Sequence, residues 1–508
     1  MSTDTTSHDR GVHYVSSRDD VAIALRPLAA DEVLTINALE IRVREPVPKG
    51  HKIAVRNILA DASVHKFGWP IGRALTDISA GSHVHTHNVT TRLSGLDEYL
   101  YRPVADASAP VPLARDAPAK QTFLGYRRAN GKVGTRNEIW ILCTVGCVAR
   151  TAERLARVGE QKFAGRVDGI HAFTHQFGCS QLGDDLSRTR RILASLAVHP
   201  NAGGVLIVGL GCESNQIDKL LAEIPEADRT RLRAFSAQAS GDEMEQGLQA
   251  LEELVRAAEQ DVRVPCPLAD LTVGLKCGGS DGFSGITANP LVGHIADRVA
   301  AAGGTPILTE IPEIFGAEHL LMERATTSQV FDGIVSVVND FKQYFIDHHQ
   351  PIYENPSPGN IAGGITTLEE KSLGAVQKGG HAPVQQVLRY GERVTHTGLT
   401  LLEAPGNDAV SSTALVAAGA TVLLFTTGRG TPLGFPVPTL KIASNSALND
   451  KKPHWIDFDA GTVLSGTSME QAGENLLQLV IDTASGQLAR NETNDEREIA
   501  IWKNGVTL

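Results

Sequence analysis

Residues 139–147 read IWILCTVGC, a run of apolar residues that passes directly into a turn ending in cysteine. Apolar runs of this kind are typical of strands that are buried on both faces of a parallel sheet. Similar runs recur along the chain, and amphipathic segments of helical length separate them. This alternation predicts an α/β domain. The expected strands are Ile139–Val145, Gly169–Thr174, Val205–Leu210, Leu271–Leu275 and Pro306–Leu308, and the expected helices are Ala149–Val158, Asp185–Ala197, Glu243–Gln260, Pro290–Ala302 and Phe331–Asp347.

The whole chain is expected to be a multidomain α/β protein, in which a small N-terminal β domain precedes two α/β open-sheet domains. Short β-type runs bounded by glycine and charged residues predict the N-terminal domain. A second series of apolar runs near the C-terminus predicts another sheet with a closing helix near Met469–Ser485, and its expected strands are Leu399–Leu402, Thr421–Phe425, Leu440–Ala443 and His454–Phe458. The expected divisions are a disordered extension (1–19), the β domain (20–96), a linker rich in proline and alanine (97–120), the first α/β domain (121–349), an irregular active-site loop (350–385) and the second α/β domain (386–508).

The composition excludes several classes of function. The chain has 508 residues and a formal net charge of −11, which argues against nucleic acid or an anionic membrane as the main partner. No apolar run reaches the length of a membrane span, and no signal-peptide core is present. Six cysteines in so long a chain do not form a disulfide scaffold. We therefore expect a cytoplasmic protein with reduced thiols, and a homo-oligomer is compatible with the sequence.

Cysteines and carboxylates follow the ends of the expected strands, where ligands bind in open α/β sheets. Turns do not favour cysteine, so its recurrence in four equivalent places favours one shared site over four separate packing roles. No CxxC pair is present, which argues against a zinc ribbon or a ferredoxin-type cluster. A single iron, manganese or zinc ion would suit these side chains. The candidate metal ligands are Cys147, Cys179, Cys212, Cys277, Glu310 and Glu313.

Histidines provide a second candidate group. His83, His85 and His87 alternate along an expected strand that extends to Asn88, so their side chains would share one face. An exposed polar strand edge is the alternative, with comparable weight. If the histidines are functional, the β domain would lean over the α/β site and supply them to it. His175, in the turn after an expected strand, is a further candidate.

Several turns could hold an anionic ligand. Arg429 lies between glycines, where a guanidinium and backbone N–H groups suit a carboxylate. A surface charge cluster is an equally good interpretation of Arg136 and Asn137. Neither a Walker motif nor a dinucleotide fingerprint is present, so ATP and NAD are disfavoured. The candidate substrate-binding residues are Arg136, Asn137, Lys276, Ser280, Asp281, Asn407, Asp408, Gly428 and Thr431.

Long motifs that contain these residues closely resemble the altronate/galactarate dehydratase family. The resemblance extends from residue 20 to residue 508, and GSHVHTHN (81–88) is similar to the SAF-type (β-clip-like) domain of that family. The altronate branch is the more similar one. The clearest motifs are YRRANGKVGTRNEIWILCTVGCV (126–148), FTHQFGCSQLGDD (173–185), LKCGGSDGFSGITANP (275–290), YENPSPGNIAGGITTLEEKSLG (353–374) and TTGRGTP (426–432).

The resemblance implies a hydro-lyase of hexuronate catabolism that converts the sugar acid D-altronate to 2-dehydro-3-deoxy-D-gluconate, with Fe²⁺ or Mn²⁺ as cofactor. Such a reaction needs a base at C2, a Lewis acid at the carboxylate and an acid for the leaving 3-hydroxyl. His175, His85 or His87 would carry the proton, and Arg429 would share the carboxylate charge. Four alternatives stay open at this point: another aldonate or aldarate such as galactarate, a non-catalytic sugar-acid binding protein, a redox protein, and an iron–sulfur dehydratase.

Overall fold

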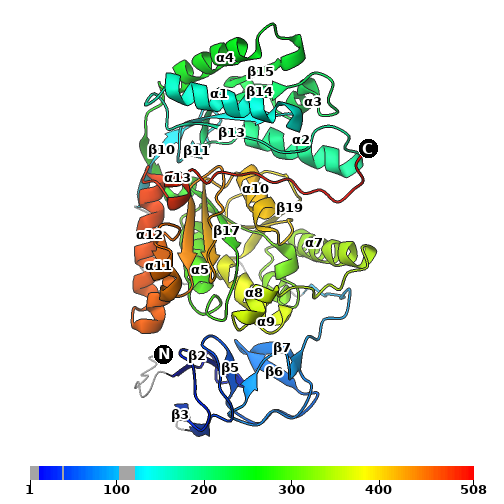
Figure 1. Cartoon of the computed structure of the whole chain (residues 1–508), viewed down its shortest axis with the longest axis vertical. Helices are drawn as coiled ribbons and strands as arrows, with labels where there is room; N and C mark the ends of the chain where they lie inside the picture. The colour runs from blue at the N-terminus through cyan, green and yellow to red at the C-terminus, as the bar shows by residue number, and fades with distance from the viewer. Residues whose placement is uncertain (1–10, 37–38, 102–120) are drawn as a thin grey trace.

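The spatial order of the domains differs from their order along the chain. The computed structural model describes residues 11–36, 39–101 and 121–508. Figure 1 shows the N-terminal β domain at one end of the long axis and a four-stranded sheet with its helices at the other. A seven-stranded sheet, the core of the central domain, lies between them. The domain with the four-stranded sheet (residues 122–267) is called the far domain, and the red C-terminal segment crosses back to it. The central domain, which comes last in the sequence, therefore lies between the N-terminal domain and the far domain.

The N-terminal domain consists of short antiparallel strands, as the sequence predicts. They form sheets in the orders β1-β2-β5-β8, β6-β7-β9 and β3-β4. Ile53 belongs to a small hydrophobic cluster within this domain, whereas Val64 and Ile71 belong to the large cluster that continues into the rest of the molecule, and all three are fully buried. The strands are β1 (Val12–His13), β2 (Val21–Ala24), β3 (Val33–Ile36), β4 (Leu39–Arg42), β5 (Lys52–Ala54), β6 (Ser63–Lys66), β7 (Trp69–Ala74), β8 (His83–Val84) and β9 (Val89–Thr90).

The prediction of a disordered extension at 1–19 is wrong for its described part. Val12 and His13 pair with β2, and Asp19 is fully buried. The carboxylate of Asp19 accepts hydrogen bonds from the backbone N–H groups of Phe67 (3.1 Å) and Gly68 (2.7 Å), so it fixes the turn between β6 and β7. Residues 1–10 lie outside the described part of the chain.

The far domain contains a parallel sheet in the order β13-β12-β14-β15. Its central strand, β12, is buried at every position, which explains the continuous apolar run in the sequence. The strand β15 lacks such a run and was not predicted. The elements are β12 (Glu138–Cys143), α1 (Ala149–Lys162), β13 (Ile170–Phe173), α2 (Gly183–Ala197), β14 (Ala202–Gly209), α3 (Ile217–Ala222), β15 (Leu232–Ser236) and α4 (Glu243–Ala258). A smaller sheet, β11-β10-β16, flanks it and consists of β10 (Thr122–Arg127), β11 (Val133–Gly134) and β16 (Val264–Pro267).

The central sheet is parallel throughout, in the order β19-β20-β18-β17-β21-β22-β23. The expected division at residues 349 and 386 is therefore wrong, because β17 and β18 pair with strands that follow residue 386. Strand pairing across the segment 350–385 leaves no trace in local sequence. The strands are β17 (Thr272–Cys277), β18 (Thr305–Leu308), β19 (Val384–Leu388), β20 (Leu399–Leu402), β21 (Val422–Thr427), β22 (Thr439–Ala443) and β23 (Phe458–Asp459).

Helices cover both faces of the central sheet, and α10 also packs against α2 of the far domain. Glycine at 419, with φ of 113°, ends α10 in the left-handed region that favours this residue. The expected strand at residues 454–458 is a turn except for Phe458, since the backbone N–H of Ile456 bonds to the carbonyl of Lys452. The helices are α5 (Ala288–Ala301), α6 (His319–Met322), α7 (Ser328–Asp347), α10 (Asp408–Ala418), α11 (Ser446–Lys451), α12 (Met469–Ala484) and α13 (Arg490–Thr493).

The segment 350–385 is irregular only in part, because short helices interrupt it. It contains α8 (Pro358–Ala362) and α9 (Leu368–Ala375). Thr367 begins α9 by accepting a hydrogen bond from the backbone N–H of Glu370, and every residue of this helix is buried. Glycine and polar residues conceal such a helix in the sequence, because it lacks an exposed polar face and therefore a helical period.

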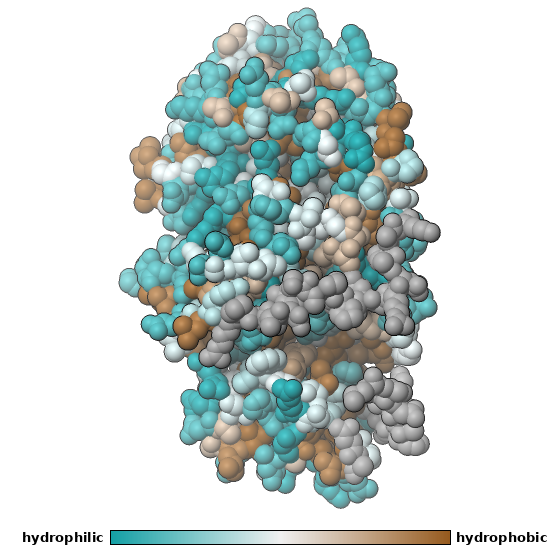
Figure 2. Space-filling view, turned by 180° about the vertical axis from the view of Figure 1, so that it is seen from behind, coloured by the Kyte–Doolittle hydropathy of each residue, from teal (hydrophilic) through white to brown (hydrophobic). Residues whose placement is uncertain are grey.

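The expected linker is described only at residues 97–101, where Asp97 and Tyr99 hydrogen-bond to Lys342 of α7. Residues 102–120 lie outside the described residues. Figure 2 shows a surface in which hydrophilic residues predominate and apolar residues are scattered. Among the helices of residues 11–36, 39–101 and 121–508, none is long and apolar enough to cross a bilayer.

Candidate active site

A cavity of about 840 Å³ opens at the carboxyl ends of β17 and β20. Strand-end turns of the central sheet form one wall, and the segment 350–385 forms another. Polar side chains from both walls converge on it, as is usual for a small-molecule site in an α/β sheet. The polar and charged side chains that line it are Cys277, Ser280, Glu313, Glu354, Asn355, Ser357, Asn360, Lys371, Asn407 and Asp408.

Cys277, Glu310 and Glu313 form a buried group at one end of this cavity. The sulfur of Cys277 lies 3.4 Å from Oε2 of each glutamate, and its backbone N–H donates to Glu310 (3.0 Å). Glu310 has φ of 71°, a left-handed conformation that a glutamate adopts at a cost in backbone energy. In the described part of the chain, this is the only group of at least three His, Cys, Asp or Glu side chains whose ligand atoms all lie within 4.8 Å of one another.

Three lysines surround this group. Lys276 contacts Glu310 and also Asp408 (2.9 Å). Lys378 lies 2.7 Å from the sulfur of Cys277 and 3.1 Å from Oε2 of Glu310. Lys371, on α9, lies 2.8 Å from Oε1 of Glu313 and also donates to the side-chain oxygens of Asn355 and Asn360. Three carboxylates thus face three ammonium groups, and the charges balance.

Burial and charge act in opposite directions on these groups. Burial raises the pKa of Glu313, but Lys371, Lys276 and Lys378 outweigh it and hold that pKa below its ordinary value. Burial, assisted by Glu310, raises the pKa of the Cys277 thiol to about 12. At neutral pH the carboxylate of Glu313 is therefore ionised while the Cys277 thiol keeps its proton.

The expected histidine strand is shorter than predicted, yet its histidines gather. The strand β8 ends at Val84, and a turn follows in which Asn88 accepts from the backbone N–H of His85 (3.0 Å). His51, which was not predicted as a site residue, joins the group. Its Nδ1 lies 3.0 Å from Nε2 of His83, and its ring centroid is 4.7 Å from that of His85. The ring of His87 lies 5.3 Å from that of His83.

These four histidines lie where the N-terminal domain contacts the central domain. Nδ1 of His85 is 3.1 Å from the hydroxyl of Thr366, in the turn before α9. Burial and the neighbouring cations and imidazoles lower the pKa of His83 to about 3 and that of His85 to about 4, so both rings are neutral at physiological pH. The prediction that the β domain leans on the α/β region holds in this respect. None of His51, His83, His85 and His87 lines the cavity.

Ion pairs hold the same interface. Lys52 and Lys66 of the N-terminal domain pair with Glu370 of α9, at 2.9 and 2.7 Å, and all three side chains are buried. Burial raises the pKa of Glu370, but the two lysines outweigh it and lower that pKa to about 2. Glu370 and Lys371 are adjacent on α9, so one helix holds the N-terminal domain and also lines the cavity.

The remaining candidates from the central sheet divide into two groups. Ser280, Asn407 and Asp408 line the cavity, and Lys276 lies behind it. Asp281, by contrast, accepts hydrogen bonds from Ser284, Ser444 and Asn445, which use its carboxylate to fix the local turns. Gly428, Arg429 and Thr431 do not line the cavity either, although Arg429 is exposed and packs beside Gly279, which does.

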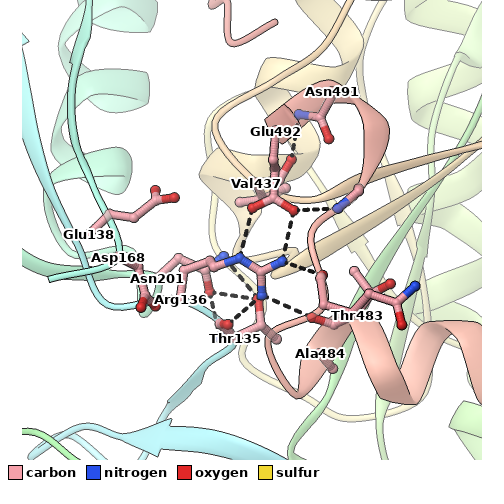
Figure 3. Close-up of polar contacts among 12 residues, drawn as sticks. Thr135, Arg136, Glu138, Asp168, Asn201, Val437, Thr483, Ala484, Asn491 and Glu492 are labelled. Atoms are coloured by element: carbon pink, nitrogen blue, oxygen red, sulfur yellow. Dashed lines mark hydrogen bonds and ion pairs between the residues drawn. The ribbon is translucent and has the colours of Figure 1, made fainter. Parts of the chain in front are cut away.

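Arg136 and Asn137 have structural roles, and the expectation that they bind substrate is wrong. Arg136 is 1% exposed, and all of its N–H groups donate to Glu492 and to the carbonyls of Thr135, Thr483 and Gln487 (Figure 3). Asn137 donates to the carbonyl of Ala258 (2.8 Å). Both precede β12 and so lie at the amino end of the sheet, where Arg136 joins the far domain to the C-terminal helices and Asn137 bonds to the end of α4.

The prediction that four cysteines share one site is also wrong. Cys277 is buried on the central sheet, whereas Cys147, Cys179 and Cys212 are exposed on the far domain. His175 lies beside Cys147 and Cys179, but its ring is buried. Its Nδ1 accepts from the backbone N–H of Phe177 (3.1 Å) and its Nε2 lies 2.9 Å from the carbonyl of Cys143, which fixes the loop.

Sequence reasoning missed Lys371, Lys378, Asn355 and Asn360. They lie in the segment that was expected to be an irregular active-site loop, so its position was informative while its individual residues were not. Their proximity to Glu313 and Cys277 depends on how α8 and α9 pack against the ends of β17 and β18. Two lysines in a run of glycine, serine and glutamate carry no local signal of such a contact.

Comparison with known proteins agrees with this arrangement. Residues 12–92 match the model of the altronate/galactarate dehydratase SAF domain. Residues 125–259 match the second domain of D-galactarate dehydratase/altronate hydrolase, and residues 268–507 match the D-galactarate/altronate dehydratase C-terminal domain. The boundary between the last two matches falls before β17, in agreement with the sheet topology.

Whole-length relatives point the same way. The chain is 49% identical to altronate dehydratase of Bacillus subtilis (strain 168) and 50% identical to that of Escherichia coli (strain K12), over 97% of this chain and 99% of each relative. It is 34% identical to galactarate dehydratase (L-threo-forming) of Escherichia coli (strain K12), over 87% of both chains. The chain belongs to the altronate/galactarate dehydratase family.

Proposed function

We propose that this protein is an altronate dehydratase, a hydro-lyase that converts D-altronate to 2-dehydro-3-deoxy-D-gluconate and water. The observation that carries the proposal is the balanced network of carboxylates and lysines at the end of a cavity that is large enough for a six-carbon acid. The greater similarity to altronate dehydratases than to galactarate dehydratase favours the aldonate. We also propose that it works in the cytoplasm, because all six cysteines are free thiols.

A divalent ion, Fe²⁺ or alternatively Mn²⁺, is part of the proposal. Cys277, Glu310 and Glu313 fit it by donor type and by distance, since their ligand atoms lie within 4.8 Å of one another. A thiolate among the donors favours Fe²⁺ over Mn²⁺. The thiol must lose its proton on binding, so occupancy is expected to rise with pH. When bound, such an ion supplies Lewis-acid stabilisation of the negative charge that develops on the substrate carboxylate.

Lys371 is the residue that we assign to proton transfer. It lines the cavity, and its ammonium group donates to the side-chain oxygens of Asn355 and Asn360 as well as to Glu313. From this position its Nζ can take the proton from C2 of the substrate. The resulting ammonium then protonates the leaving 3-hydroxyl, which departs as water. The enol that remains converts to the 2-keto acid.

The assignment of proton transfer to Lys371 replaces the expected roles of His85, His87 and His175, because none of these rings lines the cavity. We propose that the histidine group instead maintains the contact between the N-terminal domain and the turn before α9, through His85 and Thr366. Arg429 keeps its expected role in the proposal. It is exposed beside Gly279, at the rim of the cavity, where its guanidinium can attract the substrate carboxylate.

The direct test measures release of 2-keto acid from D-altronate, galactarate and other aldonates under anaerobic conditions, with Fe²⁺, with Mn²⁺ and with neither. We expect the highest kcat/KM with D-altronate and Fe²⁺. A higher kcat/KM with galactarate would reassign the substrate within the family. Binding of D-altronate in calorimetry without turnover under any condition would replace the enzyme by a non-catalytic sugar-acid binding protein.

A further inference from the structure

The three exposed cysteines of the far domain occupy equivalent places on neighbouring strands. Each directly follows a glycine in the turn after β12, β13 or β14, which lie side by side in the order β13-β12-β14. Cys143 of β12 pairs with Val208 of β14, and Cys147 and Cys212 each follow their strand partner by four residues. Cys179 follows β13, on the other side of β12. The parallel register therefore brings all three cysteines to one edge of the sheet.

Hydrogen bonds tie the three turns together. The backbone N–H of Gly146 donates to the carbonyl of Phe177, and that of Asn215 donates to the carbonyl of Gly178, both at 2.9 Å. The side chain of Asn215 also donates to the carbonyl of Thr144 (3.1 Å), and the hydroxyl of Thr144 donates to Glu213 (2.5 Å). Each turn is thus bonded to another, so the arrangement of the cysteines does not depend on mobile loops.

Two of the glycines permit this close approach. A Cβ on Gly178 would lie 2.0 Å from the carbonyl oxygen of Thr144, and a Cβ on Gly146 would lie 2.9 Å from that of His175. Gly178 also has φ of 100°, in the region that favours glycine. The cysteines that follow are exposed, whereas Cys143, Cys266 and Cys277 are buried. The turns are therefore packed tightly at their glycines and turn their thiols outward.

The surroundings of the thiols suit a metal centre held by thiolates. Cys147 and Cys179 line a hollow of about 760 Å³, which also includes Arg150 and its ion-pair partner Glu153. Cys147 lies in the short 3₁₀ helix Gly146–Val148 that leads into α1, so it is near the N-terminus of a helix, where negative charge is favoured. On the adjacent strand, the sulfur of Cys212 accepts from the amide of Gln238 (3.6 Å). Hydrogen bonds to ligand sulfurs are a usual feature of iron–sulfur sites.

The spacing of the thiols favours a cluster over a single ion. A single ion binds thiolates through bonds of about 2.3 Å and draws their sulfurs together. In the described residues, these three cysteines are not among the side chains whose ligand atoms lie within 4.8 Å of one another. They are distributed over three strands, and adjacent strands lie about 4.8 Å apart. A cubane cluster, in which sulfides separate the irons, holds its thiolates farther apart than one ion does.

We infer that Cys147, Cys179 and Cys212 bind a [4Fe–4S] cluster at the carboxyl edge of the far sheet. Each thiol loses one proton as its sulfur bonds to one iron of the preformed cluster. Three cysteines leave the fourth iron without a protein thiolate, open to water or to a small oxygen ligand. Ile499–Ile501 line this hollow, and the next residue, Trp502, lines the cavity of the candidate active site. The C-terminal segment therefore separates two neighbouring sites.

The experiment uses the full-length protein, purified anaerobically and reconstituted with iron, sulfide and a thiol reductant. We expect about four iron and four acid-labile sulfide per chain, with the broad visible absorption of a [4Fe–4S] cluster. The variant Cys147→Ser/Cys179→Ser/Cys212→Ser should lose at least nine tenths of both. These side chains are exposed, so the variant should keep the circular dichroism of the wild type. Iron without sulfide in the wild type, or unchanged iron and sulfide in the triple variant, would overturn the inference.

Two controls separate this inference from the proposed function. Cys266→Ala removes a buried cysteine outside both sites and should change neither the cluster nor turnover. Cys277→Ser should keep the full cluster but lose turnover. Loss of the cluster in Cys277→Ser would overturn the inference of an independent site. Absence of altronate turnover in the wild type, with the cluster present, would contradict the proposed function alone.

Discussion

The two parallel sheets of this protein present similar sequence patterns at their carboxyl ends and yet have different chemistry there. On both sheets, cysteine lies next to glycine at the carboxyl end of a strand. On the far sheet the thiols of Cys147, Cys179 and Cys212 are exposed, whereas on the central sheet Cys277 is buried among carboxylates and lysines. The difference comes from the segment 350–385, which covers the edge of the central sheet. What lies over a strand end, and not the strand end itself, decides whether a thiol is exposed or part of a buried charge network.

The largest effect is expected at the covered edge, in the variant Lys371→Met. Loss of the proton-transfer group should lower kcat for altronate by about 10²–10⁴-fold. The measurement is steady-state release of 2-keto acid, with circular dichroism to establish that the variant is folded. Lys162→Met removes a lysine of α1 that is about half exposed, and it should keep the turnover of the wild type. More than half of wild-type kcat in Lys371→Met would exclude Lys371 as the proton carrier.

The next effect concerns the opposite, amino end of the far sheet, where Arg136 is fully paired. Arg136→Met removes one partner of a buried ion pair and leaves Glu492 as a buried charge (Figure 3). We expect a loss of about 3–5 kcal/mol in the free energy of unfolding. Urea denaturation followed by circular dichroism measures it. A loss no greater than that of an exposed ion pair would mean that this junction does not hold the two sheets together.

A smaller effect is expected where the N-terminal domain contacts α9. Lys52 and Lys66 lower the pKa of Glu370 to about 2 from its ordinary value of 4.5, so its ionisation stabilises the folded state above pH 4.5. That contribution, roughly 3 kcal/mol, should be lost as the pH falls from 4.5 to 2. In Glu370→Gln the stability at pH 6 should be lower and the dependence on pH over this range weaker. Thermal unfolding at a series of pH values tests this, and equal slopes for the two proteins would contradict it.

The smallest effect is expected at the exposed surface of the far domain. Arg150 pairs with Glu153 one helical turn away on α1, and its side chain is 93% exposed. Solvent screens such a pair, so Arg150→Met should leave the free energy of unfolding unchanged within error. Urea denaturation of Arg150→Met and Arg136→Met under the same conditions compares their free energies of unfolding directly. A clear destabilisation would show that this edge of the sheet is less solvent-exposed than its geometry indicates.

Much of the fold was predictable because local sequence patterns indicate the strands and helices. The buried strand β12 has a continuous apolar run, and helices such as α1 and α12 have amphipathic periods, so all three were expected near their observed positions. The strand β15 and the helix α9 were not predicted because they lack these patterns. The strand lies at the edge of its sheet without a fully apolar run, and the helix is buried on all sides.

The candidate site was predictable in part. Cys277, Glu310 and Glu313 were expected from their places at strand ends, and the structure brings them together. The same reasoning wrongly added three cysteines, since one sequence pattern serves two different sheets. Lys371 was missed because lysine is common on helix surfaces and its burial here depends on the packing of α9 against Glu313.

The sequence by itself determined the family, the alternation of strands and helices, and the places where polar residues leave the strands, because these depend on residues that are close together in the chain. Only the tertiary structure decided that β17 and β18 join the last strands in one sheet, and that the segment 350–385 seals its edge. It also decided which cysteine is buried with lysines and which three are exposed. Those outcomes depend on contacts between residues far apart in the chain, and the free energy of such contacts comes from burial and charge pairing that no local pattern encodes.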